Sequence, residues 1–230
     1  AYTGMVWPVV PPQPGALALA LQFQLDRSQW QAPEVLRAAQ FRQLAVLLSH
    51  AHDTVPFYRE RLAAAHFRGG VITAEWFSAL PVLTRSDLCA AGDALYSRNV
   101  PAAHAPVTSG QTSGSTGTPI TYLMTPVTQA FWRAFNLRNQ LWHRRDLGLK
   151  LVAIRPDRGA RGEQGVDLRG WGPSTADVYH DGPSSLLHSA NTLDRQLDWL
   201  ATQEPAYLLT LASNLLELAR EMRRRGMRLP

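Results

Sequence analysis

The chain has 230 residues, of which 45% are hydrophobic and 18% charged, an ordinary balance for a globular protein that buries a core. Its net charge of +5 suits anionic small molecules as well as nucleic acid. The sequence has neither a zinc-finger spacing nor an aromatic RNA-binding signature, and no apolar run long enough for a membrane span, so we expect neither nucleic-acid binding nor membrane insertion.

Cysteine use and the start of the chain bear on the cellular compartment. Cys89 is the only cysteine, which excludes an intrachain disulfide and a cysteine-based metal site. We expect it to be a small buried residue in a reducing compartment, the cytoplasm. The Pro-rich start lacks the basic segment of a signal peptide.

Residues 1–106 are predicted to be a helical region without strands. Apolar residues recur at helical intervals from Glu34 to His52, with Pro33 at the expected start of that helix. Pro56 ends one helix and begins another. Thr84, three residues before Asp87, has the pattern of an N-terminal cap. His50 and His52 form a His-x-His pair, which we interpret as surface rather than metal-binding.

The most informative stretch is 108–119, TSGQTSGSTGTP. Apart from Gln111 and Pro119, every residue in it is Thr, Ser or Gly, and the β-type run ITYLMT follows. Glycine lets backbone N–H groups approach an anion closely, and hydroxyl groups add donors. A flexible linker could share this composition but would not require Pro119 or the strand behind it. We therefore predict a phosphate-binding loop that leads into a strand at Ile120.

Residues 107–230 are predicted to be an α/β region. Strands are expected at 120–124, 149–154, 178–180 and 207–211, and helices at 126–145, 191–202 (with Asn191 as its cap) and 213–225, the last ended by Gly226. Alternating strands and helices predict βαβ units and a largely parallel sheet. We expect Trp132, Trp142 and Trp199 to be core residues. The Gly-rich segment 155–174 is expected to be a loop, either on the surface or facing a substrate.

The loop resembles the phosphate-binding signature of adenylate-forming enzymes, a superfamily that includes acyl-CoA synthetases. The residues that carry the resemblance are Thr112, Ser113, Gly114, Ser115, Thr116, Gly117 and Thr118, followed by Pro119. The superfamily usually has lysine after this proline, whereas this chain has Ile120. That departure and the segments 50–62, 80–88 and 207–226 are similar to the phenylacetate-CoA ligase branch.

The resemblance implies an acid–CoA ligase that forms AMP, with ATP, Mg²⁺ and coenzyme A as cofactors. The seven residues from Thr112 to Thr118 would bind the nucleotide, the substrate would be a small carboxylic acid, and the fold would be part of the N-terminal domain. No catalytic residue can be named and no protein metal ligand is expected. Later motifs of such enzymes, including a catalytic lysine, are not found before Pro230. We therefore expect the N-terminal part of an enzyme, inactive by itself.

The alternative is a non-catalytic binding or partner module that keeps the adenylate-forming fold. The sequence leaves open the acid that is activated and whether the acceptor is coenzyme A or another thiol. It also leaves open whether the chain is an expressed piece, a proteolytic fragment or a naturally short protein. The candidate protein partners are the missing C-terminal portion and a second copy in a homodimer.

Overall fold

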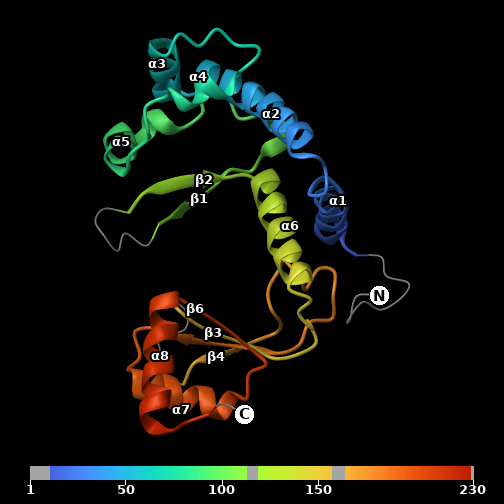
Figure 1. Cartoon of the computed structure of the whole chain (residues 1–230), viewed down its shortest axis with the longest axis vertical. Coiled ribbons are helices and arrows are strands. Elements are labelled where there is room, and N and C mark those ends of the chain that lie inside the picture. Colours follow the sequence, from blue (N-terminus) through green and yellow to red (C-terminus); the bar gives the residue numbers. More distant parts are fainter. Residues whose placement is uncertain (1–10, 113–118, 157–163, 229–230) are drawn as a thin grey trace. The chain divides into compact units, whose positions relative to one another are not determined.

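A computed structural model describes residues 11–112, 119–156 and 164–228 (Figure 1). The chain divides into two compact units, one formed by Phe23–Phe131 and the other by Ala1–Gln22 together with Trp132–Pro230. The predicted functional division between residues 106 and 107 rests on composition and stays a prediction. None of the described helices is long and apolar enough to cross a membrane.

The first unit begins with short helices packed around a small core. Leu48, Leu62 and Ile72 form the buried centre, and partly buried aromatic residues including Tyr58 and Trp76 pack around it. The bounds of the helical elements that precede the first strand, with α1 shared between the units, are α1 Gln13–Ser28, α2 Pro33–Thr54, α3 Pro56–Ala64, α4 Ala74–Ser78, α5 Arg85–Ala91, and the 3₁₀ helices η1 Gly92–Leu95 and η2 Ala102–His104.

Local signals begin these helices as predicted. Proline occupies the first turn of both α2 and α3, where its missing N–H leaves no hydrogen bond unmade. At α5 the side chain of Thr84 accepts from the backbone N–H of Asp87 at 3.2 Å, and the Asp87 carboxylate accepts from the backbone N–H of Thr84 at 2.8 Å. This capping box satisfies two N–H groups that would otherwise lack partners. The predicted cap at Thr84 is confirmed.

A two-stranded antiparallel hairpin follows, made of β1 (Thr108–Gln111) and β2 (Thr121–Met124), and α6 (Pro126–Trp142) begins directly after it (Figure 1). The strand predicted behind the loop is present. The stretch 108–111 was expected to belong to the loop and is instead a strand, because its backbone pairs with β2. Hydrogen bonding across the hairpin therefore overrides the weak strand propensity of its Ser and Gly residues.

The second unit contains a four-stranded sheet in the order β4-β5-β3-β6. β3 (Leu151–Arg155) is parallel to both β5 (Ser184–His188) and β6 (Tyr207–Thr210), whereas β4 (Val166–Leu168) is antiparallel to β5. The chain runs from β5 through α7 (Leu193–Gln203) to β6 and then into α8 (Ala212–Arg225). The prediction of an α/β fold, with helices first and a largely parallel sheet after them, is confirmed.

The core of this unit lies between the sheet and the two helices α7 and α8 (Figure 1). Its fully buried members come from two strands and both helices; they are Val152, Ile154, Leu187, Leu197, Trp199, Leu200 and Leu218. Trp199 was predicted to be a core residue, and its exposed fraction is 3%. Burial of these side chains against the parallel strands is what holds α7 and α8 on the sheet.

Three local predictions in this unit were wrong. The run 178–180 is part of a turn, because Val178 and Tyr179 pack with Leu137 and Leu147 in a separate cluster. The strand instead begins at Ser184, six residues after Val178, and segment 155–174, expected to be a loop throughout, contains β4. The cap of α7 is Thr192, whose side chain accepts from the backbone N–H of Arg195 at 3.3 Å, rather than Asn191.

Two arginines near the end of α8 bind Glu221. The Glu221 carboxylate accepts from Arg224 at 2.5 Å and from Arg225 at 2.6 Å, and these bonds lower the pKa of Glu221 from 4.5 to about 2. Arg225 also pairs with Asp194 of α7. This ion-pair network therefore joins the two helices that cover the sheet.

Replacing Glu221 with glutamine is expected to lower the melting temperature slightly at neutral pH, since exposed ion pairs contribute little and are screened. Because the folded-state pKa is lowered, the contribution is complete above pH 4.5 and is lost as the pH falls to about 2. Thermal unfolding followed by circular dichroism across this range should show the two proteins converging. Glu217→Gln, which removes one pair with Arg220, is the control. A constant difference down to pH of about 2 would contradict the assignment.

Candidate phosphate-binding hairpin

The predicted loop residues fall, in the sequence, between the two strands of the β1–β2 hairpin. The register pairs Thr108 with Met124 and Gln111 with Thr121, so the chain between Gln111 and Thr121 is the connection. Gly110 lies opposite Tyr122, and a Cβ atom at position 110 would lie 2.7 Å from the Tyr122 hydroxyl. The missing side chain therefore lets the tyrosine ring lie across β1.

Thr112 closes the base of the loop. Its backbone N–H donates to the carbonyl of Ile120 at 3.0 Å, and its side-chain oxygen accepts from the backbone N–H of Ile120 at 3.0 Å. The second bond uses one lone pair of the hydroxyl and leaves its proton for another acceptor. Of the seven predicted nucleotide-binding residues, Thr112 is the one that the structure describes. Ser113, Gly114, Ser115, Thr116, Gly117 and Thr118 lie outside the described residues, so their role stays a prediction.

The opposite end of the hairpin is held by the start of α6. The backbone N–H of Thr125 donates to the Thr128 hydroxyl at 2.8 Å, and the N–H of Thr128 donates to the Thr125 hydroxyl at 3.2 Å. The side chain of Gln129 also reaches the hydroxyl of Thr108 in β1, at 3.4 Å. The Thr-Pro-Val-Thr sequence could have indicated this cap, since a hydroxyl three residues before a second one suits a helix N-terminus. The hairpin is thus anchored between the loop base and a capped helix.

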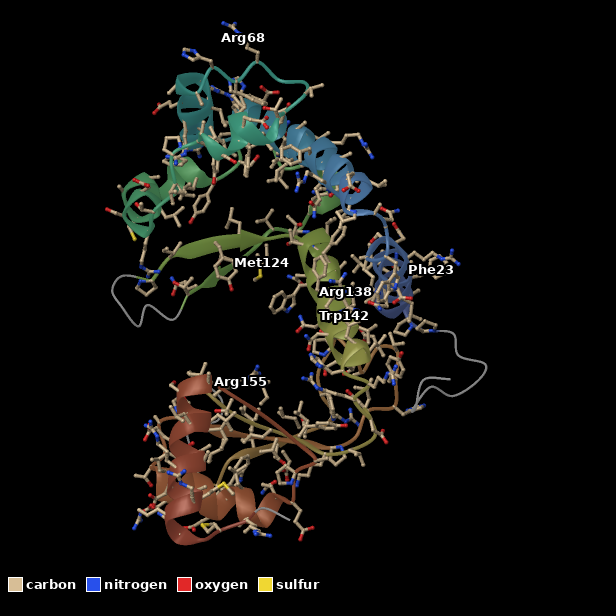
Figure 2. All side chains as sticks on the ribbon, viewed as in Figure 1. Phe23, Arg68, Met124, Arg138, Trp142 and Arg155 are labelled. Atoms are coloured by element: carbon tan, nitrogen blue, oxygen red, sulfur yellow. The ribbon has the colours of Figure 1, made fainter. Side chains whose placement is uncertain are left out.

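The later turns of α6 expose aromatic residues that were expected to be buried. The exposed fractions of Trp132 and Trp142 are 69% and 54%, so the prediction that they are core residues was wrong. The guanidinium carbon of Arg138 lies 4.2 Å from the centre of the Trp142 ring and 5.8 Å from that of Phe135 (Figure 2). These are cation–π contacts on the helix surface. Cys89 is likewise exposed rather than buried.

The carboxyl groups with clearly lowered pKa values have structural partners. For Asp87 the backbone N–H of Thr84 lowers the pKa most, and for Glu75 a backbone N–H at the start of α4 does so. Within the described part of the chain, no three His, Cys, Asp or Glu residues gather as a metal site. His52 contacts Asp53 at 3.0 Å.

No protein-family model matches the sequence, and no curated protein matches it. Three solved structures of 2-hydroxyisobutyryl-CoA ligase do share its fold, with TM-scores of 0.54, 0.58 and 0.59 at 21%, 21% and 20% sequence identity. The first is an open conformation in complex with 2-HIB-AMP and CoA, the second is the thioesterification state with the same two molecules, and the third is the postadenylation state with 2-HIB-AMP.

Each likeness covers 86% of this chain but only 45%, 41% and 41% of the three ligase chains. The chain therefore spans less than half the length of these solved structures. At this level of identity the likeness concerns the fold. The chain has the fold of part of 2-hydroxyisobutyryl-CoA ligase.

Proposed function

We propose that this chain is the N-terminal part of an ATP-dependent enzyme that activates a small carboxylic acid as an acyl-adenylate and passes the acyl group to coenzyme A. The observation that supports the proposal is the β1–β2 hairpin, whose two strands flank the Ser/Thr/Gly segment in the sequence and are joined at Thr112 and Ile120. The likeness in fold to a CoA ligase supports the same function.

The loop would act on the outer phosphates of ATP. Gly114 and Gly117 would offer unobstructed backbone N–H groups, and Thr116 would offer a hydroxyl. Holding the β- and γ-phosphates fixes the leaving group while the acid attacks the α-phosphate in line. No carboxylate occurs between Thr108 and Met124, so a Mg²⁺ ion would depend on phosphate oxygens and on carboxylates from other parts of the enzyme. When bound, the ion would offset the charge of the triphosphate.

The same proposal extends to the branch of the enzyme family, the division of the chain and the cellular compartment. Ile120 in place of the usual lysine supports the phenylacetate-CoA ligase-like branch, and Ile120 borders a mostly apolar cavity in which an ammonium group would be poorly solvated. The division at residues 106 and 107 would separate a helical layer from the nucleotide-binding region. ATP and coenzyme A as substrates are consistent with a cytoplasmic enzyme.

Binding of Mg·ATP to the 230-residue chain, followed by ³¹P NMR, tests the proposal. The β- and γ-phosphate signals should broaden more than the α-phosphate signal, because the loop contacts the outer phosphates. Thr116→Val keeps the side-chain shape but removes a hydroxyl, and it should weaken binding about tenfold or more. Thr121→Val makes the same change in β2 and should have no such effect. Equal binding by both variants, or no binding by the unmodified chain, would contradict the proposed role of the loop.

A further inference from the structure

A cavity of about 490 Å³ lies within the unit Phe23–Phe131. One wall is β2, and the others come from α2, α3, α5, η1, η2, the start of α6 and the segments that join them. Its apolar lining residues include Leu88, Leu95, Val100, Pro101, Val107 and Leu123. None of the lining residues is buried, so the cavity is open to solvent, and its volume lies within the range of roughly 300–1,000 Å³ that ligand sites measure. The size of the cavity is that of a small-molecule site.

Polar side chains also line the cavity; besides those discussed next they are Thr121, Tyr122, Thr125 and Thr128. Tyr58, Tyr96 and His104 border the cavity, and neither tyrosine hydroxyl nor the imidazole of His104 hydrogen-bonds to another described residue. Two further polar groups are already engaged, since Ser97 donates to Thr54 at 3.0 Å and His50 contacts Thr54 at 3.3 Å. The cavity thus combines apolar side chains with several hydrogen-bonding groups, including the hydroxyls of Tyr58 and Tyr96 and the imidazole of His104, a combination suited to orienting one small ligand.

The charge of the lining restricts the chemical class of the ligand. None of the described residues that line the cavity is Asp, Glu, Lys or Arg. A charged group placed among apolar side chains without an ionic partner is costly, whereas a hydroxyl can exchange hydrogen bonds with tyrosine and histidine. We propose that this cavity binds an uncharged, largely apolar molecule of about two fused rings with one hydroxyl group. The proposal does not rest on ATP binding at the loop.

The cavity is linked to the loop through β2. Ile120 borders the cavity and exchanges both of its backbone hydrogen bonds with Thr112, the residue that closes the loop. A ligand against β2 therefore changes the surroundings of the loop base. Binding is expected to shift the amide NMR signals of Thr112 and Ile120 and to leave those of α8 in place.

The probe is 2-naphthol, added to the full 230-residue chain without ATP and measured by isothermal titration and ¹H–¹⁵N NMR. We expect a Kd on the order of 0.1 mM. Leu123→Trp fills the cavity from β2 and should weaken binding at least about tenfold. Leu216→Trp is the matched control on α8, since the exposed fractions of the two leucines are 41% and 50%. The anion 2-naphthoate should bind at least about tenfold more weakly than 2-naphthol, because its charge finds no Lys or Arg side chain in the lining.

A second variant keeps the test decisive if Leu123→Trp disturbs folding. Tyr96→Phe retains the ring and removes only the hydroxyl, and it should weaken binding of 2-naphthol about threefold to tenfold. Circular dichroism melts identify any variant that no longer folds. The proposal is overturned if the unmodified chain does not bind 2-naphthol, if a folded Leu123→Trp or Tyr96→Phe binds it unchanged, or if 2-naphthoate binds as tightly. Loss of ATP binding in Thr116→Val with 2-naphthol binding intact would separate this site from the loop.

Discussion

Replacing Leu218 with alanine is expected to lower the free energy of unfolding of its unit by about 2–5 kcal/mol. Leu218 projects from α8 into the cluster that contains Val152, Leu187 and Leu200, and its exposed fraction is 1%. The substitution removes apolar atoms from water-free surroundings and leaves a cavity that the parallel sheet cannot close. Because the chain has two compact units, the measurement must report on the unit that contains Leu218. Hydrogen exchange of backbone amides in β3 and α7 does so, since both elements belong to that unit.

Leu216 offers a matched control on the same helix. Its exposed fraction is 50%, so Leu216→Ala makes the same chemical change with little loss of burial. We expect it to alter the free energy of unfolding by less than about 0.5 kcal/mol. If the two variants lost equal protection from exchange, α8 would not be held to the sheet by the buried cluster, and the description of this core would be wrong.

Replacing Gly117 with valine should reduce the ATP-dependent half-reaction at least about tenfold to a hundredfold in the longer enzyme that the proposed function implies. A valine side chain would keep the backbone away from the triphosphate and would remove several contacts together. Acid-dependent exchange of pyrophosphate into ATP measures this step. We expect the fold to be unaffected, because surface loops of this composition generally pack little core.

The second half-reaction supplies the control for this variant. When it is started from acyl-adenylate made beforehand, transfer to the thiol needs no triphosphate, so Gly117→Val should reduce it much less. Thr116→Val should show the same pattern with a loss no larger than that of Gly117→Val. Equal losses in the two half-reactions would mean that the loop supports the structure of the enzyme rather than the position of ATP.

Much of the helical structure follows from signals that lie within a few residues. The capping box of Thr84 and Asp87 and the proline starts of α2 and α3 follow from hydrogen bonds and backbone angles inside a single turn. The end of α8 also follows from a local signal. Gly226 has a left-handed φ of 64°, which glycine adopts without strain. The β-type run behind the loop likewise indicated the strand β2, whereas β1 was not expected because its pairing with β2 is a tertiary contact.

The strands and the exposed surfaces depended on contacts between distant residues. Ser184–His188 has weak strand signals and becomes β5 because it pairs with β3, about thirty residues earlier. The run 178–180 has strand-like residues but turns, because packing against Leu137 stabilises a different backbone. Trp199 and Trp142 both occur at helical intervals with other apolar residues, so the sequence predicted both to be buried. Only Trp199 is buried, because it packs with the strands of the sheet. The cavity beside β2 arises in the same way, since it combines side chains from elements up to about eighty residues apart that no local pattern relates.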